Sequence, residues 1–191
     1  MNGKIIIVEG SLASGKSTFA KQLSKAIKVP CFIKDTFKDA LCASISINNR
    51  EISSSFSAVT FDGIIYAAER LIETNIPIII EGNFVPAGIK RVDEAGVIKA
   101  LIDKYACKSL TIKFSGNTKI LYKRFLEREK SPERGQANRM FSEISFDDFN
   151  RFCSNLSEFD VGGEIIKVDT TNFNEINYKK LIEKVGYFIK N

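Results

Sequence analysis

The sequence predicts an α/β fold in which helices cover both faces of a parallel sheet of five strands. Short apolar runs typical of buried strands alternate along the 191 residues with longer stretches whose apolar residues recur at helical spacing. A strand, a helix and a second strand in succession form a right-handed crossover, which makes the two strands parallel. Because no internal repeat and no linker interrupts this alternation, we expect a single domain over residues 1–191.

The first half of the chain carries three of the expected strands. Residues 5–8 are wholly apolar, as in a strand buried on both faces, and Pro30 disfavours helix at the residue before it. Polar residues, serine among them, dominate between 48 and 55, which favours a loop. The elements expected in order are a strand over 4–8, a helix over 15–26, a strand over 31–33, a helix from 35 through 41 toward 47, a loop over 48–55, a helix over 58–73 and a strand over 76–80.

The second half carries the last two strands. Asn117 is a favourable N-cap and predicts the start of a helix, whereas Gly96 weakens the middle of the helix expected around it. Residues 130–142 are polar and irregular. The elements expected in order are a helix over 88–105, a strand over 110–114, a helix over 117–129, a short helix over 146–159, a strand over 164–168 and a helix over 175–189.

The pattern G-x-x-x-x-G-K-S lies between the first strand and the first helix, at residues 10–17. Its glycines allow a tight turn in which backbone N–H groups point inward, and the helix adds the positive end of its dipole, so that an anion is cradled. Lys16 brings a mobile positive charge to phosphates, and the Ser17 hydroxyl suits Mg²⁺. We expect a nucleotide site made of Gly10, Ser11, Ala13, Ser14, Gly15, Lys16, Ser17 and Thr18.

Further polar residues follow strands at the edge where an open α/β sheet binds its ligand, beyond the carboxyl ends of the strands. Asp35 follows the second strand, where it could orient an acceptor hydroxyl and take its proton, serve as a helix N-cap, or do both. Glu81 ends an apolar run in the Walker B arrangement, where it could hold Mg²⁺ directly or through water, or bind substrate. The turn that ends in Thr171 either adds backbone contacts to an adenine pocket or is an ordinary turn.

Arg124 and Arg128 are four residues apart and therefore share one face of a predicted helix, and Arg134 follows in an irregular segment. An anion between the two helix arginines would offset their mutual repulsion, and the forked guanidinium suits phosphate oxygens. We expect a basic clamp that closes over phosphates. The alternative is a solvated face on which these arginines pair with Glu127 and Glu129.

Composition excludes several classes of site. The chain has no histidine, which rules out histidine bases, histidine metal ligands and serine–histidine triads, and its four cysteines have neither disulfide-framework nor zinc spacing. A net charge of +5 suits a polyphosphate ligand, but no basic run or aromatic–basic motif predicts binding to nucleic acid. No apolar run is long enough to cross a membrane and no signal peptide is recognisable, so we expect a cytoplasmic protein without membrane contact.

The sequence resembles the P-loop kinases of the nucleoside-monophosphate-kinase type. It is more similar to their small AAA_33-like, zeta-toxin-like and chloramphenicol-phosphotransferase-like relatives. The likeness lies in residues 5–18, 79–84, 121–128 and 166–171. It implies a three-layer fold with the strand order 2-3-1-4-5, Mg-ATP as phosphoryl donor and a mobile lid over about 130–145. It also implies that Asp35 contacts the molecule that accepts the phosphoryl group. The opening also looks like that of deoxynucleoside kinases, but their acidic–Arg–Ser triplet after the third strand is missing, as is the arginine that adenylate kinases carry there.

The sequence therefore predicts an ATP- and Mg²⁺-dependent phosphotransferase that moves the γ-phosphate of ATP to a hydroxyl of a small molecule. Two alternatives stay open: a nucleotide-dependent switch or ATPase without a small acceptor, and a kinase of a macromolecule or of a nucleoside or nucleotide. The expected catalytic residues are Lys16, Asp35, Arg124, Arg128 and Arg134, and the expected metal ligands are Ser17 and Glu81.

Overall fold

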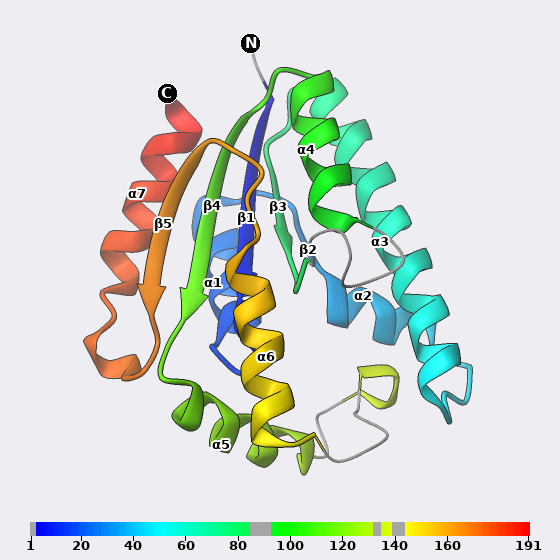
Figure 1. The fold of residues 1–191 in the computed structure, drawn as a ribbon. Helices are drawn as coiled ribbons and strands as arrows, with labels where there is room; N and C mark the ends of the chain where they lie inside the picture. Colours follow the sequence, from blue (N-terminus) through cyan, green and yellow to red (C-terminus); the bar gives the residue numbers. More distant parts are fainter. Residues whose placement is uncertain (1–2, 85–92, 132–134, 139–143) are drawn as a thin grey trace.

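A computed structural model describes residues 3–84, 93–131, 135–138 and 144–191 of the chain. Strands and helices alternate along it, as the sequence predicts (Figure 1). The strands are β1 Lys4–Gly10, β2 Cys31–Ile33, β3 Ile78–Glu81, β4 Lys108–Ser115 and β5 Glu164–Asp169. The helices are α1 Lys16–Ile27, α2 Lys34–Leu41, α3 Arg50–Glu73, α4 Glu94–Lys104, α5 Thr118–Glu129, α6 Phe146–Ser157 and α7 Tyr178–Lys190, with short 3₁₀ turns η1 Gln136–Asn138 and η2 Phe173–Glu175.

All five strands run parallel in one sheet, in the order β2-β3-β1-β4-β5 (Figure 1). The central strand is β1, whose Ile5 pairs with Ile78 of β3 on one side and with Ser109 of β4 on the other. Both the predicted fold class and the predicted strand order are confirmed. Because the chain crosses from one side of β1 to the other between β3 and β4, the sheet has its topological switch point at the carboxyl end of β1, where such sheets bind ligands.

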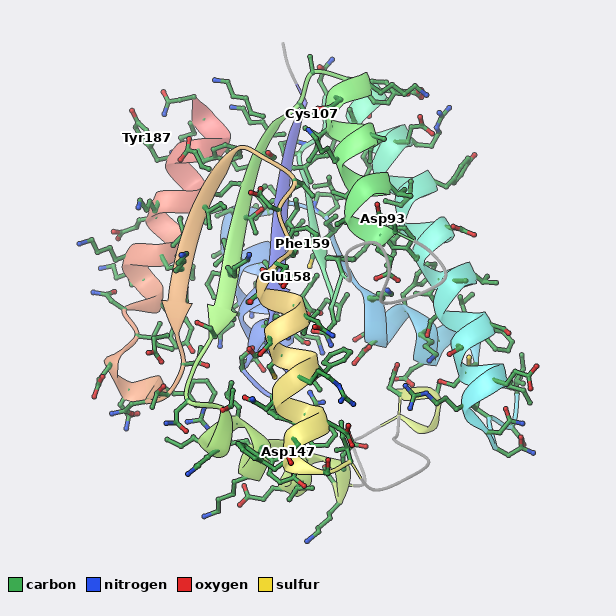
Figure 2. The ribbon with its side chains drawn as sticks, in the orientation of Figure 1. Asp93, Cys107, Asp147, Glu158, Phe159 and Tyr187 are labelled. Atoms are coloured by element: carbon green, nitrogen blue, oxygen red, sulfur yellow. The ribbon has the colours of Figure 1, made fainter. Side chains whose placement is uncertain are left out.

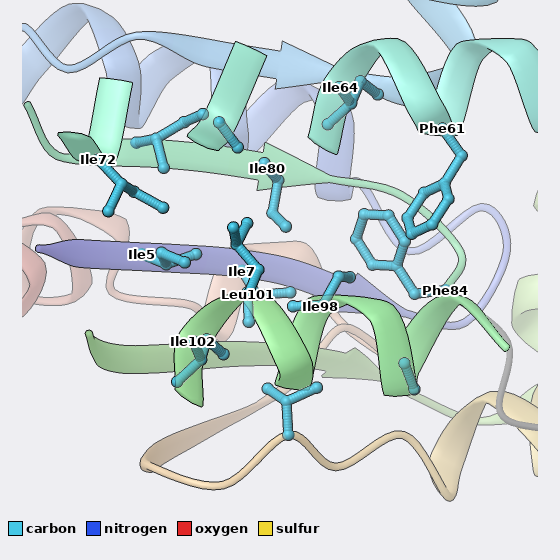
Figure 3. Packing of buried hydrophobic residues seen from close by; sticks show 14 of the residues in the cluster. Ile5, Ile7, Phe61, Ile64, Ile72, Ile80, Phe84, Ile98, Leu101 and Ile102 are labelled. Atoms are coloured by element: carbon cyan, nitrogen blue, oxygen red, sulfur yellow. The ribbon is translucent and has the colours of Figure 1, made fainter. Parts of the chain in front are cut away.

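Alternate side chains of β1 point to opposite faces of the sheet and belong to two separate cores. Ile5 and Ile7 pack with α3, α4 and β3 (Figure 3). Ile6 and Val8 pack instead with α1 and α7. All four side chains are fully buried, and each such burial contributes roughly 2 kcal/mol of hydrophobic free energy. The strand is therefore held firmly up to the point where the loop of residues 10–15 begins.

A smaller core supports that loop from one side. Leu121 and Phe125 of α5 pack against Phe149 and Cys153 of α6, and Leu12 of the loop packs on the same cluster. Both helices lie toward the edge formed by the carboxyl ends of the strands (Figure 1). The loop is thus fixed by β1 at its start and by the α5–α6 pair at its side.

The predicted loop over residues 48–55 is wrong, because α3 already begins at Arg50. The side chain of Asn49 caps it by accepting a hydrogen bond from the N–H of Ile52 at 2.9 Å. Ile52 and Phe56 then pack on a small cluster that contains Cys42 and other buried residues. A good N-cap and tertiary packing here outweigh the weak helix propensity of the serines.

The helix expected over 88–105 is observed as α4 from Glu94 onward, and residues 85–92 lie outside the described part of the chain. Gly96 does not interrupt the helix, since it lies in the first turn, where its N–H donates to Asp93 Oδ1 at 2.9 Å. A Cβ at position 96 would overlap the Asp93 carboxylate, so glycine suits this cap. Glu94 forms a buried ion pair with Lys34, which ties the start of α4 to the start of α2 (Asp93 is labelled in Figure 2).

Two further helix bounds differ from the predictions by three residues or more. α2 ends at Leu41 and does not extend toward Ile47. The last helix begins at Tyr178 rather than at 175, because the turn η2 comes first. In contrast, the predicted cap at Asn117 is confirmed, since its side chain accepts hydrogen bonds from the N–H groups of Lys119 and Ile120.

The four cysteines are free thiols, as their spacing predicts. Cys42 and Cys153 are buried, and Cys31 and Cys107 are partly buried. Burial is the main reason that the pKa of Cys31 rises to about 12, so this thiol stays protonated near neutral pH. In the part of the chain that the structure describes, no helix has both the length and the apolar character needed to cross a membrane.

Candidate functional site

The loop between β1 and α1 has the concave backbone of an anion-binding turn. Three of its residues have positive φ: Gly10 at 127°, Ala13 at 55° and Gly15 at 84°. A Cβ at position 10 would overlap the backbone carbonyl of Phe114, so the loop passes β4 at a distance that only glycine allows. Gly15 is the N-cap of α1 and offers no side chain to its free N–H groups, which leaves them available to an external anion.

Lys16 lies inside this loop and is only 6% exposed. Its ammonium donates to the carbonyl oxygen of Ser11 at 2.7 Å, and the buried hydroxyl of Ser14 donates to the same oxygen at 2.7 Å. Burial is the main reason that the pKa of Lys16 lies below its usual value, while the nearby carboxylates of Glu81 and Glu9 oppose that shift. A buried ammonium of this kind gains much from an anionic ligand that replaces a neutral carbonyl.

Ser17 and Glu81, 64 residues apart in sequence, meet at the carboxyl edge of the sheet. The Ser17 hydroxyl donates to Glu81 Oε2 at 3.2 Å. Glu81 is 3% exposed, and burial raises its pKa to about 7 even though the positive charge of Lys16 acts in the opposite direction. A buried carboxylate beside a hydroxyl is therefore poorly compensated without a further cation.

Asp35 follows β2 as expected, but it is not the N-cap of the next helix. α2 starts one residue earlier, at Lys34, with Ile33 in the cap position and no side-chain cap. Asp35 instead lies in the first turn, where a carboxylate is favoured by the helix dipole. Its charge acts on both Lys16 and Glu81, and its backbone carbonyl accepts a hydrogen bond from Asn138 at 2.8 Å.

Arg124 uses two of its guanidinium nitrogens on the protein itself. They donate to the carbonyl oxygens of Thr170 and Thr171 at 2.6 and 2.9 Å. The guanidinium carbon lies 4.0 Å from the centroid of the Phe173 ring. This arrangement differs from the expected phosphate clamp, because the fork that would grip phosphate oxygens is directed at backbone carbonyls.

Arg128 lies one turn further along α5 and acts electrostatically on the phosphate loop, which comprises residues 10–17. Its positive charge acts on both Lys16 and Glu81. Its own helix also holds it, with Glu129 Oε1 at 3.9 Å and the Phe125 ring centroid at 5.8 Å. Arg134, the third arginine of the expected clamp, lies outside the described residues.

The turn after β5 is closed by internal hydrogen bonds. The N–H of Thr171 donates to Asp169 Oδ1 at 2.7 Å, and the Thr171 hydroxyl accepts from the N–H of Asn117 at 2.9 Å. With its carbonyl also taken by Arg124, Thr171 has its backbone groups engaged within the protein. The turn in this way holds the Arg124 guanidinium in place.

A cavity of about 660 Å³ connects these groups. It runs from the loop and α1, past the start of α2, to α5 and the turn η2. Glu81 is buried behind Ser17 rather than on its wall. The predicted site residues on the cavity wall are Ala13, Ser14, Gly15, Lys16, Ser17, Thr18, Asp35, Arg124 and Arg128.

Sequence reasoning missed Phe173 and Tyr178, which line the same cavity. A signal was present, because both follow β5 at its carboxyl end, but aromatic residues are more often part of a core. Also missed was Glu9, which is fully buried and faces Lys113 at 3.6 Å. Its signal was a carboxylate placed directly before the loop, after the apolar run of residues 5–8.

Comparison with known proteins gives likeness in structure only. No family model matches the chain, and no curated protein does. A candidate kinase from Chloroflexus aurantiacus superposes with a TM-score of 0.84 at 22% sequence identity, over 97% of each chain. Shikimate kinase from Bacteroides thetaiotaomicron gives a TM-score of 0.54 at 11% identity over the whole of both chains. A gluconokinase from Sinorhizobium meliloti gives 0.53 at 12% identity, over 99% of this chain and 92% of the other.

These identities are too low to transfer a substrate, but the agreement covers nearly the full length in each case. It includes the parallel sheet of order β2-β3-β1-β4-β5 and the helices on both of its faces. The chain therefore has the fold of the P-loop kinases.

Proposed function

We propose that the chain is an ATP- and Mg²⁺-dependent phosphotransferase that moves the γ-phosphate of ATP to a hydroxyl of a small-molecule acceptor. The observation that carries this proposal is the meeting of Ser17 and Glu81 at 3.2 Å beside the buried ammonium of Lys16. Asp35 lies on the wall of the same cavity, within reach of an acceptor. The proposed phosphate-binding loop and the carboxylate proposed to orient the acceptor hydroxyl thus line the same cavity.

The loop and Lys16 bind the donor phosphates. The backbone N–H groups at the start of α1 have no side-chain cap, so phosphate oxygens complete them. The Lys16 ammonium moves from the carbonyl of Ser11 to the β- and γ-phosphates, where a charged partner replaces a neutral one. Arg128 adds positive charge from the side of α5 and stabilises the negative charge on the transferring group.

Ser17 and Glu81 fit a Mg²⁺ ion in chemical type. A hydroxyl and a carboxylate are hard oxygen ligands. Burial raises the pKa of Glu81 to about 7, and a bound dication would offset the cost of keeping this carboxylate charged. Within the described ranges no group of three His, Cys, Asp or Glu side chains could hold a metal unaided. The remaining ligands would be phosphate and water oxygens, as is usual for Mg²⁺. Such an ion supplies charge neutralisation at the phosphates.

Asp35 orients the acceptor hydroxyl and accepts its proton as the phosphoryl group is transferred. Its position in the first turn of α2, beyond the end of β2, supports this role. Arg124 acts by stacking and by fixing the turn at Thr170 and Thr171. Arg134 stays a predicted member of the clamp.

The structural neighbours support a small acceptor. By their names, shikimate kinase and gluconokinase act on small hydroxylated molecules, and both share the fold over nearly the whole chain. The resemblance to zeta-toxin-like and chloramphenicol-phosphotransferase-like kinases points the same way. A small acceptor also suits a cavity of about 660 Å³ that has to hold a nucleotide as well.

The test is ADP release from Mg-ATP in the presence of a panel of hydroxyl acceptors: nucleosides, nucleoside monophosphates, sugars, shikimate, gluconate, aminoglycosides and chloramphenicol. Lys16→Ala serves as the blank. We expect one acceptor class to raise turnover well above the basal rate, and Asp35→Asn to lower the stimulated kcat by about 10²-fold or more without weakening ATP binding. Asp62→Asn, on the exposed surface of α3, is the matched control.

Two results would contradict the proposal. One is turnover that the Lys16→Ala variant retains in full. The other is tight ATP binding with no stimulation by any acceptor, which favours a nucleotide-dependent switch or a macromolecular substrate.

A further inference from the structure

The end of the cavity away from Asp35 is formed by flat side chains. Arg124 and Phe173 are stacked there, with 4.0 Å between the guanidinium carbon and the ring centroid, and Tyr178 lies beside them on the cavity wall. The Phe173 ring also abuts the phosphate loop, since a Cβ at Gly15 would lie 3.2 Å from its Cε1 atom. Phe173 is 37% exposed, so part of the ring remains open to a ligand.

Arg124 is held in a fixed orientation. Its Nη1 donates to the carbonyl of Thr170 and its Nη2 donates to the carbonyl of Thr171. The guanidinium is therefore anchored by its edge and offers its face for stacking, as arginine does on aromatic rings.

The turn next to this stacked pair has little left with which to read a base by hydrogen bonds. The N–H and the hydroxyl of Thr170 both donate to the carbonyl of Ser115, at 2.7 and 2.8 Å. The N–H of Thr171 donates to Asp169 and its hydroxyl accepts from Asn117. With both carbonyls bonded to Arg124, the backbone N–H and carbonyl of each threonine already have a partner.

Tyr178 does not distinguish one purine from another. Its ring stacks on Phe19, with 6.0 Å between centroids and 30° between planes, and this fixes the position of its hydroxyl. A phenol hydroxyl both donates and accepts. It therefore suits the amino group at position 6 of adenine and the carbonyl oxygen at position 6 of guanine alike.

We propose that the stacked Arg124–Phe173 pair binds the donor base by its face, so that the site accepts purine nucleoside triphosphates as a class and uses GTP about as well as ATP. This inference rests on the proposed function, because it takes the cavity to be the phosphoryl-donor site. Stacking on an aromatic ring contributes to binding with little regard to base identity, whereas a site that hydrogen-bonds the edge separates analogues by orders of magnitude. A pyrimidine offers less surface to stack and binds more weakly.

The test is the dissociation constant of Mg-ATP, Mg-GTP and Mg-CTP measured by calorimetry on the full chain, without any acceptor. We expect Kd values for ATP and GTP within about fivefold of each other, with CTP weaker. Phe173→Leu keeps an apolar side chain against Gly15 and Arg124 but removes the aromatic face, and should weaken both purine nucleotides about tenfold and by the same factor.

The matched control is Tyr187→Leu. Tyr187 is 70% exposed on α7 and lies near the opposite end of the sheet from the cavity (Figure 2). This variant should leave all three Kd values unchanged. Thermal unfolding of each variant checks that the Phe173→Leu chain is folded.

Two results overturn the inference and leave the proposed function standing. One is ATP binding that is more than about thirtyfold tighter than GTP binding, which shows that the base edge is read. The other is unchanged purine affinity in folded Phe173→Leu. If no nucleoside triphosphate binds to the wild-type chain, the proposed function itself is wrong, and this inference is overturned with it.

Discussion

Glu9 is a carboxylate at a position where the fold compensates its charge poorly. It is fully buried, and neither of its oxygens receives a hydrogen bond from the residues that the structure describes. Lys113 lies 3.6 Å away but donates to the carbonyls of Ser157 and Phe159 at 2.9 and 2.6 Å (Phe159 is labelled in Figure 2). Burial raises the pKa of Glu9 to about 7, against the smaller opposing effects of Lys113 and Lys16.

This shift predicts a pH-dependent stability. The unfolded chain releases the Glu9 proton near 4.5, whereas the folded chain keeps it until about 7. The free energy of unfolding is therefore unaffected by titration of Glu9 below pH 4.5. It falls as the pH rises from 4.5 to 7, because the unfolded chain releases this proton first, and Glu9 causes no further change above pH 7. The loss is about 3 kcal/mol. Glu81, whose pKa is also about 7, adds a similar fall.

Between pH 4.5 and 7.5, the unfolding free energy of the Glu9→Gln variant should fall about half as far as that of the wild-type chain. Of the two carboxyl groups with raised pKa, only Glu81 remains in this variant. Urea unfolding at a series of pH values measures this slope. Glu158→Gln, at an exposed position after α6, is the control (Figure 2). A Glu9→Gln slope equal to that of the wild type would contradict the assignment.

Among single residues, the sequence predicts those whose role is local. The phosphate loop could be recognised because Gly10, Gly15 and Lys16 act within one turn of chain. Glu9 could not, because its neighbouring cation Lys113, and the carbonyl of Phe159 to which Lys113 donates, come from distant parts of the sequence. The use of Arg124 was also hidden, since its partners Thr170 and Thr171 are 46 and 47 residues away.

Among the elements, α2, α3 and η1 are joined by one chain of hydrogen bonds. The Lys38 ammonium donates to the Ser53 hydroxyl at 2.6 Å, and that hydroxyl donates to the carbonyl of Ala137 at 2.9 Å. Asn138 adds the bond to the carbonyl of Asp35. The turn η1 is thereby linked to the helix that carries Asp35, the residue proposed to orient the acceptor hydroxyl.

Ser53→Ala should destabilise the chain by about 1–2 kcal/mol, because a part-buried ammonium and a carbonyl each lose a partner. We expect faster hydrogen exchange in residues 135–138 and at the start of α3. The control is Ser55→Ala, two residues away, whose exposed hydroxyl donates to the carbonyl of Glu51 in its own helix. Equal stability and exchange in the two variants would show that the link carries no energy.

The start of α3 also shows why the sequence misplaces an element. Serines in residues 48–55 favour a loop by propensity, yet the helix forms because Asn49 caps it and because Ile52 and Phe56 pack on the cluster that includes Ala137. Ala137 belongs to η1, which is far from α3 in the sequence. Tertiary contacts of this kind override local preference and leave no local pattern to read.

For the whole molecule, the alternation of strands and helices predicts a parallel sheet, and the resemblance adds its order, which the structure confirms. What the sequence leaves open is the shape of the cavity, because three separate connections and the helices α1, α2, α5 and α7 contribute to its wall. The flat end at Phe173 and Tyr178 appears only when the turn after β5 is folded against α1 and α5.

A ligand that binds across these parts should stabilise the chain as a unit. Mg-ATP at about 100 times its Kd adds about 2.7 kcal/mol to the unfolding free energy, which corresponds to a rise of about 5–10 °C in Tm for a chain of this size. Differential scanning calorimetry with and without Mg-ATP measures the shift.

The role of Ser17 and Glu81 is tested by the part of that shift that depends on the metal. In the wild-type chain we expect a larger rise in Tm with ATP and Mg²⁺ than with ATP and EDTA, since a dication at the buried Glu81 carboxylate offsets its charge. Ser17→Ala removes the hydroxyl beside Glu81 while the backbone of the loop stays, and should keep the rise with ATP and EDTA but lose most of the added rise with Mg²⁺. If that variant retains the whole Mg²⁺ increment, the ion is bound elsewhere and Ser17 is only a structural partner of Glu81.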